Sequence, residues 1–205
     1  MTAIVAAPRA LGATDAPQTA WLVRHAPTAW TGRRWCGRSD PPLSREGREV
    51  AAEAAKRLAP DLPGDVTILS SPLRRARETG LAIANAAGRP VSVLPDLAEV
   101  DFGRIEGLTW AELSTLEPAL AERILAREPV DWPGGEAALA VSGRAVRMAT
   151  EIRNIGGPVV VVSHGRFLAA LHAALVDGAG NTTEPTTFAP GSVFRVRLAG
   201  HEGNG

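Results

Sequence analysis

Two of the four histidines stand just after short apolar runs, where a nucleophile and a partner could meet. Arg24 and His25 follow the run 20–23, and His164 comes shortly after the β-branched run 159–162. A neutral imidazole can attack phosphorus and form a covalent intermediate. A second imidazole, in its protonated form, can hold the oxygens of the transferring group. The pair therefore indicates phosphoryl transfer through a histidine.

Arginines adjoin these histidines and could neutralise a phosphate group. Arg24 precedes His25, and Arg74, Arg75 and Arg77 stand at the start of an expected helix. A transferring phosphoryl group spreads its negative charge over three oxygens, which a forked guanidinium can bind two at a time. The common alternative for such a cluster is a solvated helix face. Cations at a helix start also oppose the helix dipole, unless one of them turns toward an anion.

A phosphatase further needs a proton donor, because an alkoxide is a poor leaving group at neutral pH. Glu99, Asp101 and Glu106 follow an expected strand within one loop. Residue type alone does not choose among these three carboxylates, and each could also be an ordinary surface group.

The elements expected to position these groups are short strands that alternate with helices. The predicted strands are 20–23, 66–69, 91–94, 159–162 and 192–198, and the predicted helices are 45–58, 72–87, 109–127, 136–154 and 166–176. In the second helix Ser71 would be the N-cap and Pro72 the first helical residue, and Pro118 should break the third.

This alternation predicts an α/β fold, a three-layer α/β/α sandwich around a mainly parallel sheet. The alternating apolar and polar pattern of 192–198 favours an edge position for the last strand. Ligands of such sheets bind outside the carboxyl ends of the strands. That rule selects the turns 24–28, 70–75 and 163–165.

Composition narrows the classes of partner. The 205 residues are 45% apolar and 21% charged with a formal net charge of zero, which argues against a nucleic acid or an anionic membrane surface as partner. We expect one domain over residues 19–199 between tails 1–18 and 200–205. Neither a secretory signal nor a membrane-length apolar run is evident, and Cys36 is the single cysteine, so we expect a cytoplasmic protein. Histidine spacing typical of zinc sites is missing, so no metal or cofactor is expected.

Five motifs follow one another along the chain. They are Arg-His-Ala at 24–26, Gly-x-x-Asp-x-Pro-Leu-Ser-x-x-Gly at 37–47, Ser-Ser-x-Leu-x-Arg-Ala-x-x-Thr at 70–79, Glu-x-x-x-Gly-x-x-Glu-Gly at 99–107 and Ser-His-Gly at 163–165. Together they resemble the histidine phosphatase superfamily, the phosphoglycerate mutase-like proteins. The ordered set is specific, whereas a single Arg-His pair would not be.

The resemblance implies a role for each matching residue. His25 would accept the phosphoryl group, with Arg24, Arg75 and His164 around it; Arg75 is preferred to Arg74 because it directly precedes the alanine. Glu99 would be the proton donor, with Asp101 as the alternative. The residues expected to line the mouth of the pocket and bind substrate are Thr28, Thr31, Arg34, Cys36 and Gly37.

Three positions depart from the family pattern. Ala26 replaces a glycine and would be strained if the backbone there had a positive φ. Thr31 stands where many relatives carry an asparagine that touches the phosphate, which puts its role in doubt. Cys36 stands where a small polar or aromatic residue is common, and it could simply be a small buried apolar residue.

The segment 100–163 is shorter than that of cofactor-dependent mutases, which favours hydrolysis, and the Pro-Gly-Gly-Glu turn at 133–136 resembles the α-ribazole phosphatase-like branch. We therefore expect a phosphomonoesterase acting through a phosphohistidine on a small metabolite, α-ribazole 5′-phosphate or a sugar phosphate. The alternatives are mutase-type transfer, a non-catalytic phosphate-binding protein and a protein-phosphohistidine phosphatase. Monomer and homodimer both stay open, since Trp110 and Trp132 could mark a lid or a dimer contact.

Overall fold

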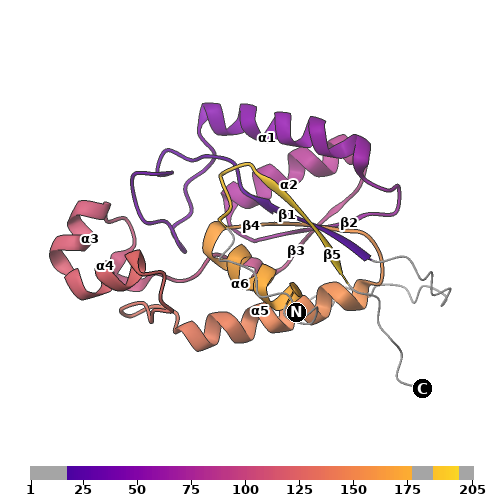
Figure 1. Ribbon diagram of the computed structural model, residues 1–205. Helices are drawn as coiled ribbons and strands as arrows, with labels where there is room; N and C mark the ends of the chain where they lie inside the picture. The colour runs from indigo at the N-terminus through magenta and orange to yellow at the C-terminus, as the bar shows by residue number, and fades with distance from the viewer. Residues whose placement is uncertain (1–17, 177–186, 199–205) are drawn as a thin grey trace, which may run out of the picture.

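A computed structural model of the chain describes residues 18–176 and 187–198, and there a five-stranded sheet lies between two layers of helices (Figure 1). The strands, in the order β3-β2-β4-β1-β5, are β3 (Val91–Val93), β2 (Thr67–Ser70), β4 (Val159–Ser163), β1 (Gln18–Arg24) and β5 (Val193–Leu198). The first four run parallel, and β5 pairs antiparallel with β1 at one edge. The predicted three-layer sandwich, its mainly parallel sheet and its last edge strand are confirmed.

The helices cover both faces of the sheet because the strands are apolar on both sides. Trp21 and Val23 of β1 pack in the cluster beneath α1 and α2, whereas Ala20 and Leu22 pack in the cluster beneath α5 and α6. Such continuous apolar runs are typical of parallel strands buried on both faces. The four covering helices are α1 (Arg45–Leu58), α2 (Arg74–Ala87), α5 (Ala138–Ile155) and α6 (Gly165–Val176).

Two further helices form a lobe that projects from one end of the sandwich (Figure 1). This α3–α4 lobe consists of α3 (Trp110–Leu116), α4 (Pro118–Leu125) and the loops around them, and it has its own apolar cluster. Trp132 lies inside that cluster at 5% exposure, so it supports the lobe core rather than an outer surface. Trp110 is 41% exposed. Short 3-10 helices occur at η1 (Ala59–Asp61), η2 (Pro95–Leu97) and η3 (Gly103–Ile105).

The start of α2 differs from its prediction. The helix begins at Arg74 with Leu73 as N-cap, so Ser71 is not the cap and Pro72 is not helical. The Ser71 hydroxyl instead accepts a hydrogen bond from the Leu73 N–H at 3.2 Å and contacts His164. The first N–H group of the helix is bound by a carboxylate distant in sequence: Asp40 Oδ1 accepts a hydrogen bond from the Arg74 N–H at 2.6 Å.

Other boundaries lie close to those predicted. The break before Pro118 is confirmed, since α3 ends at Leu116 and α4 begins at Pro118. β1 begins at Gln18, one residue inside the expected tail, and the rest of both predicted tails lies outside the described residues. Within the described ranges, no helix combines the length and apolarity needed to cross a bilayer.

The chain that leads into β5 returns to the carboxyl end of β1. The Gly191 N–H donates to the carbonyls of Arg24 and His25, both at 3.1 Å, and the Arg24 N–H donates to the Ser192 carbonyl at 3.2 Å. The guanidinium of Arg24 also donates to the Phe188 carbonyl at 2.6 Å. Segment 188–192, which we call the C-terminal brace, therefore supports the end of the first strand.

Candidate active site

The turns after β1, β2 and β4 meet at one edge of the sheet because these strands are parallel neighbours. Arg24 is opposite Ser163 in the β1–β4 pair, and Ser70 is opposite Val162 in the β2–β4 pair. The residues that come next, His25 and His164, are thereby brought together, with their ring centroids 5.0 Å apart.

Hydrogen bonds define the protonation state and orientation of His25. Its Nδ1 lies 2.8 Å from the Ala26 carbonyl, and because a carbonyl only accepts, Nδ1 carries the proton. Its Nε2 accepts a hydrogen bond from Arg75 Nε at 3.3 Å and therefore keeps its lone pair. Burial, together with the nearby cations Arg75 and Arg24, lowers the pKa of His25 to about 3. The ring is thus held as the neutral imidazole that nucleophilic attack requires.

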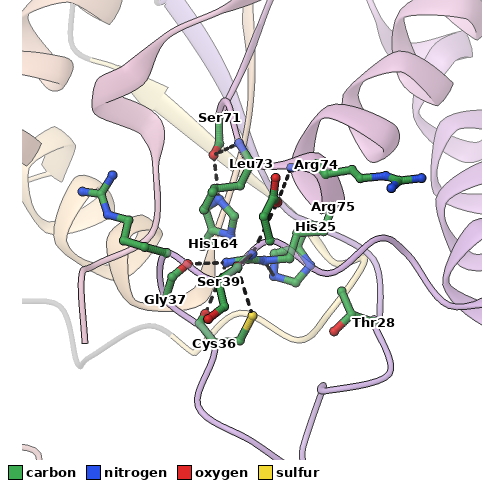
Figure 2. A network of polar contacts seen from close by, with 12 residues as sticks. His25, Thr28, Cys36, Gly37, Ser39, Ser71, Leu73, Arg74, Arg75 and His164 are labelled. Carbon is green, nitrogen blue, oxygen red and sulfur yellow. Dashed lines mark hydrogen bonds and ion pairs between the residues drawn. The ribbon is translucent and has the colours of Figure 1, made fainter. Parts of the chain in front are cut away.

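His164 is fully buried beside it and keeps one ring nitrogen without a partner. Its Nε2 lies 2.7 Å from the Ser71 hydroxyl, whereas its Nδ1 contacts no hydrogen-bonding group (Figure 2). Burial, then Arg75 and His25, hold the pKa of His164 well below its usual value. Within the described residues, His164 Nδ1 and Arg24 Nε are the two buried side-chain polar atoms without a partner. Such groups are rare in proteins. Arg24 directly precedes His25 in the chain and the His164 ring lies 5.0 Å from the His25 ring, which fits an anion bound beside His25.

Arg75 is fully buried and links His25 to the loop 36–39. Its guanidinium donates to the carbonyls of Ser39 at 2.6 Å, Gly37 at 2.8 Å and Cys36 at 3.2 Å (Figure 2). The loop approaches so closely that a Cβ on Gly37 would lie 2.3 Å from Glu106 Oε1. The carbonyl of Gly37 thus helps to hold Arg75 in place. Gly37 does not line the cavity, contrary to the prediction.

The other arginines at the start of α2 lie apart from the histidines. Arg74 is exposed and pairs with Glu78 at 2.7 Å. Arg77 is also exposed. Of the three, only Arg75 reaches His25.

Glu99 is the one of the three candidate carboxylates that faces the cavity. Its Oε1 accepts from the Val100 and Phe167 N–H groups, both at 3.0 Å, and its Oε2 accepts from the Arg166 N–H at 3.3 Å. Two of these donors belong to the first turn of α6, so a helix N-terminus orients the carboxylate.

Asp101 and Glu106 serve the surrounding loops. Asp101 Oδ1 accepts from the Gly103 N–H at 2.9 Å, which stabilises the turn at η3. Glu106 accepts from the backbone N–H groups of Arg38 and Ser39. Neither carboxylate lines the cavity.

A cavity of about 590 Å³ opens beside His25, which lines it together with Thr28, Thr31, Arg34 and Cys36. The Thr31 hydroxyl accepts from the Thr28 N–H at 2.9 Å and so holds the loop. Arg34 donates to the Gly107 carbonyl at 2.7 Å. Burial raises the pKa of Cys36 to about 11, which keeps its thiol protonated.

The cavity also has lining residues that the sequence did not single out. Arg166 lies over the rings of Trp35 and Trp132, at 5.5 and 5.0 Å from their centroids. Its position directly after the Ser-His-Gly motif was the available signal. Further unpredicted lining residues are Trp30, Trp35, Arg33 and Arg127.

Two further points concern the backbone conformation at Ala26 and groups of possible metal ligands. Arg127 is the one non-glycine residue with a positive φ in the described part of the chain, so Ala26 adds no strain of that kind. Among residues 18–176 and 187–198, no three His, Cys, Asp or Glu side chains are grouped to hold a metal ion.

The sequence matches the histidine phosphatase superfamily (branch 1) over residues 20–204. It is 35% identical over 192 residues to glucosyl-3-phosphoglycerate phosphatase of Mycolicibacterium vanbaalenii, which covers 88% of this chain and 83% of the relative. The structure of mycobacterial glucosyl-3-phosphoglycerate phosphatase with VO3 superposes with a TM-score of 0.75 at 30% identity, covering 87% and 90% of the two chains. An Escherichia coli protein proposed to be an α-ribazole-5′-P phosphatase gives a TM-score of 0.69 at 26% identity, covering 78% and 80%.

Proposed function

The chain belongs to the histidine phosphatase superfamily, and from this membership we propose that His25 carries the phosphoryl group of a small phosphomonoester during its hydrolysis. The named phosphatase relatives support a phosphoric monoester hydrolase acting on small phosphorylated molecules. The observation that carries the assignment to His25 is the orientation of its ring. Nδ1–H is bound to the Ala26 carbonyl, so Nε2 is the nitrogen left to attack.

In the first step Nε2 of His25 attacks phosphorus, and the bond from phosphorus to the ester oxygen breaks. The imidazole gains positive charge, which the Ala26 carbonyl stabilises through Nδ1–H. Arg24 Nε and His164 Nδ1, both without partners, would donate to the phosphoryl oxygens. Glu99, in its protonated form, gives its proton to the departing alkoxide.

In the second step water replaces His25 on phosphorus. The Glu99 carboxylate takes a proton from a water molecule, whose oxygen attacks phosphorus as the bond to Nε2 breaks. Inorganic phosphate leaves, His25 returns to its neutral form and Glu99 is protonated again. Each group thereby ends the cycle in the state in which it began.

A sugar phosphate is the substrate class that we propose. Three tryptophans line the cavity, namely Trp30, Trp35 and Trp110, and aromatic rings of this kind can pack against the apolar faces of a sugar. The relatives named as glucosyl-3-phosphoglycerate phosphatases make that compound the first candidate. The same rings could stack on the base of α-ribazole 5′-phosphate, which is the second candidate to assay. The cytoplasm is our proposed compartment, since the single cysteine fits a reducing environment.

The covalent intermediate provides the direct test. The enzyme is incubated with a phosphomonoester labelled in its phosphoryl group and then quenched, and we expect an acid-labile, base-stable label on the peptide that contains His25. We expect His25→Ala to lose the label and at least about 10⁴-fold in kcat. His172→Asn is the matched control, because His172 does not line the cavity, and it should keep the label. Full hydrolytic activity in His25→Ala would contradict the proposal.

Mutase activity is tested on the same preparation. The enzyme is supplied with 3-phosphoglycerate and 2,3-bisphosphoglycerate, and the products are analysed for 2-phosphoglycerate. Release of inorganic phosphate without the 2-isomer is the result expected of a hydrolase.

A further inference from the structure

The end of α4 has an unusual residue in a left-handed conformation. Arg127 has φ 58°; its N–H donates to the Ile124 carbonyl at 3.1 Å, and the Glu128 N–H donates to the Arg123 carbonyl at 3.0 Å. These two bonds form a Schellman motif, whose left-handed residue is usually glycine because a Cβ there is unfavourable. The chain itself follows that rule at the ends of α2 and α5, where Gly88 and Gly156 have φ 63° and 66°.

The side chain of Arg127 has no role in stabilising the fold that could explain this choice. It lines the cavity, and within the described residues it makes no hydrogen bond or ion pair. Arg33, in the loop after β1, likewise lines the cavity without such a partner among the described residues. A backbone conformation that disfavours arginine, kept at a ligand cavity, points to a functional reason for the side chain.

The charge of the cavity exceeds what a phosphoryl group requires. Of the residues that the structure describes, five arginines and one carboxylate, Glu99, line it, although the chain as a whole has no net charge. Arg24 flanks His25, and Glu99 acts electrostatically on both Arg24 and Arg166. The remaining lining cations, Arg33, Arg34 and Arg127, are exposed, and we call this exposed side of the cavity its mouth. Arg34 donates to the Gly107 carbonyl at 2.7 Å and forms only a long ion pair with Glu112, at 3.9 Å.

We propose that Arg127, together with Arg33 and Arg34, binds a second anionic group on the substrate, a carboxylate carried by the leaving group. The inference rests on the proposed phosphatase activity and adds a specificity site to it. A guanidinium binds a carboxylate through two parallel hydrogen bonds, so these residues select leaving groups that carry one. Arg127 is a specificity-determining residue and takes no part in the transfer of the phosphoryl group.

The test uses two substrates that differ at one group. 3-Phosphoglycerate carries a carboxylate where glycerol 3-phosphate carries a hydroxymethyl group. We expect the wild-type enzyme to prefer 3-phosphoglycerate in kcat/KM, and Arg127→Gly to reduce that preference about fivefold to tenfold, chiefly through KM. Any loss of activity with glycerol 3-phosphate should be smaller than the loss with 3-phosphoglycerate, because glycerol 3-phosphate has no carboxylate for Arg127 to bind. Its urea midpoint should be unchanged or higher, since glycine suits the left-handed position.

Two controls separate this effect from a general change in charge. Arg57→Ala removes an exposed arginine of α1 that does not line the cavity, and it should leave the preference unchanged. Raising the sodium chloride concentration should reduce the wild-type preference and have little effect on Arg127→Gly, because interactions between exposed charges are screened.

The outcomes distinguish the two proposals. Two results overturn the carboxylate site and leave the phosphatase activity intact. In the first, wild type and Arg127→Gly show the same preference for 3-phosphoglycerate. In the second, the wild type hydrolyses both substrates through His25 without any preference. Hydrolysis of neither compound counts against the proposed function. Binding then decides the site: both compounds are titrated against the fluorescence of the cavity tryptophans in wild type and Arg127→Gly. Tighter binding of 3-phosphoglycerate that is lost in the variant supports the site, and equal binding overturns it.

Discussion

The two ends of the cavity are built in different ways. At the phosphoryl end, His25, His164 and Arg75 are buried at the carboxyl ends of adjacent strands and are oriented by hydrogen bonds to backbone carbonyls or to the Ser71 hydroxyl. At the mouth, Arg33 and Arg127 are exposed side chains without a polar partner in the described part of the chain, and they come from a loop and from the α3–α4 lobe.

In the proposed mechanism, the buried end transfers the phosphoryl group and the exposed mouth selects the leaving group. The register of β1, β2 and β4 sets the positions of the phosphoryl-end groups, and a one-residue shift of a strand would turn its side chains to the opposite face. Residues of the mouth can change without altering any strand pairing. Relatives with different leaving groups can therefore share one phosphoryl end, and the mouth is where their specificity should differ.

The largest expected contrast between the two ends is between two arginines. Arg75→Met leaves three carbonyls of the loop 36–39, one buried and two partly buried, without their donor, so we expect a loss of about 3 kcal/mol in the free energy of unfolding. We also expect kcat/KM to fall about 10³-fold. Arg34→Met removes an exposed side chain. It should lower the free energy of unfolding by less than about 1 kcal/mol and kcat/KM by at most about tenfold, through KM. Urea unfolding and steady-state kinetics measure both, and effects of similar size would remove the distinction drawn here.

A smaller contrast concerns Glu99, the proposed proton donor, which lines the cavity. Glu99→Gln cannot protonate an alkoxide, so kcat should fall about 10²-fold to 10³-fold with glycerol 3-phosphate. With p-nitrophenyl phosphate, whose leaving group needs no proton, the loss should be below about tenfold. Asp101→Asn does not alter a cavity residue and is the matched control. If Asp101→Asn showed the leaving-group dependence and Glu99→Gln did not, the roles of the two carboxylates would be exchanged.

A further contrast is in stability as a function of pH, to which buried His25 contributes. The pKa of His25 is about 3 in the folded protein and 6.5 in the reference state, so the unfolded chain binds a proton in this window that the native chain does not. Its contribution to stability is complete above about pH 6.5 and is lost as the pH falls toward 3, at about 1.4 kcal/mol per pH unit. Urea unfolding of wild type and His25→Asn between pH 4 and 7 measures the slope, which should be lower in the variant. Equal slopes would mean that His25 is not kept neutral by burial.

Much of the phosphoryl end could be predicted from the sequence, because local patterns determine it. The apolar runs before His25 and His164 end where the strands end, and parallel pairing brings those ends together. The predicted start of α2 was wrong, and the reason is a pair of long-range contacts. Ser71 has the local pattern of an N-cap, but its hydroxyl contacts His164, and the helix start is met by Asp40.

The mouth could not be predicted in the same way. Arg127 and Arg33 enter one cavity only because the α3–α4 lobe folds beside the loop after β1, and no local motif encodes that contact. Gly37 shows the converse case. The motif that contains Gly37 was visible in the sequence. A glycine is needed there because Glu106 and Val100 approach closely, which only the three-dimensional structure shows.

The C-terminal brace has a consequence for the order in which activity is acquired. A ribosome makes His25 early, but β4, which lies beside β1, and the brace that binds the carbonyls of Arg24 and His25 are made more than a hundred residues later. Contacts between residues so far apart in sequence form slowly, because a long loop must close first. A nascent chain thus carries His25, the proposed nucleophile, through most of its synthesis without the neighbouring strand and the brace that support the end of β1. We therefore expect catalytic activity only after the last strand has docked.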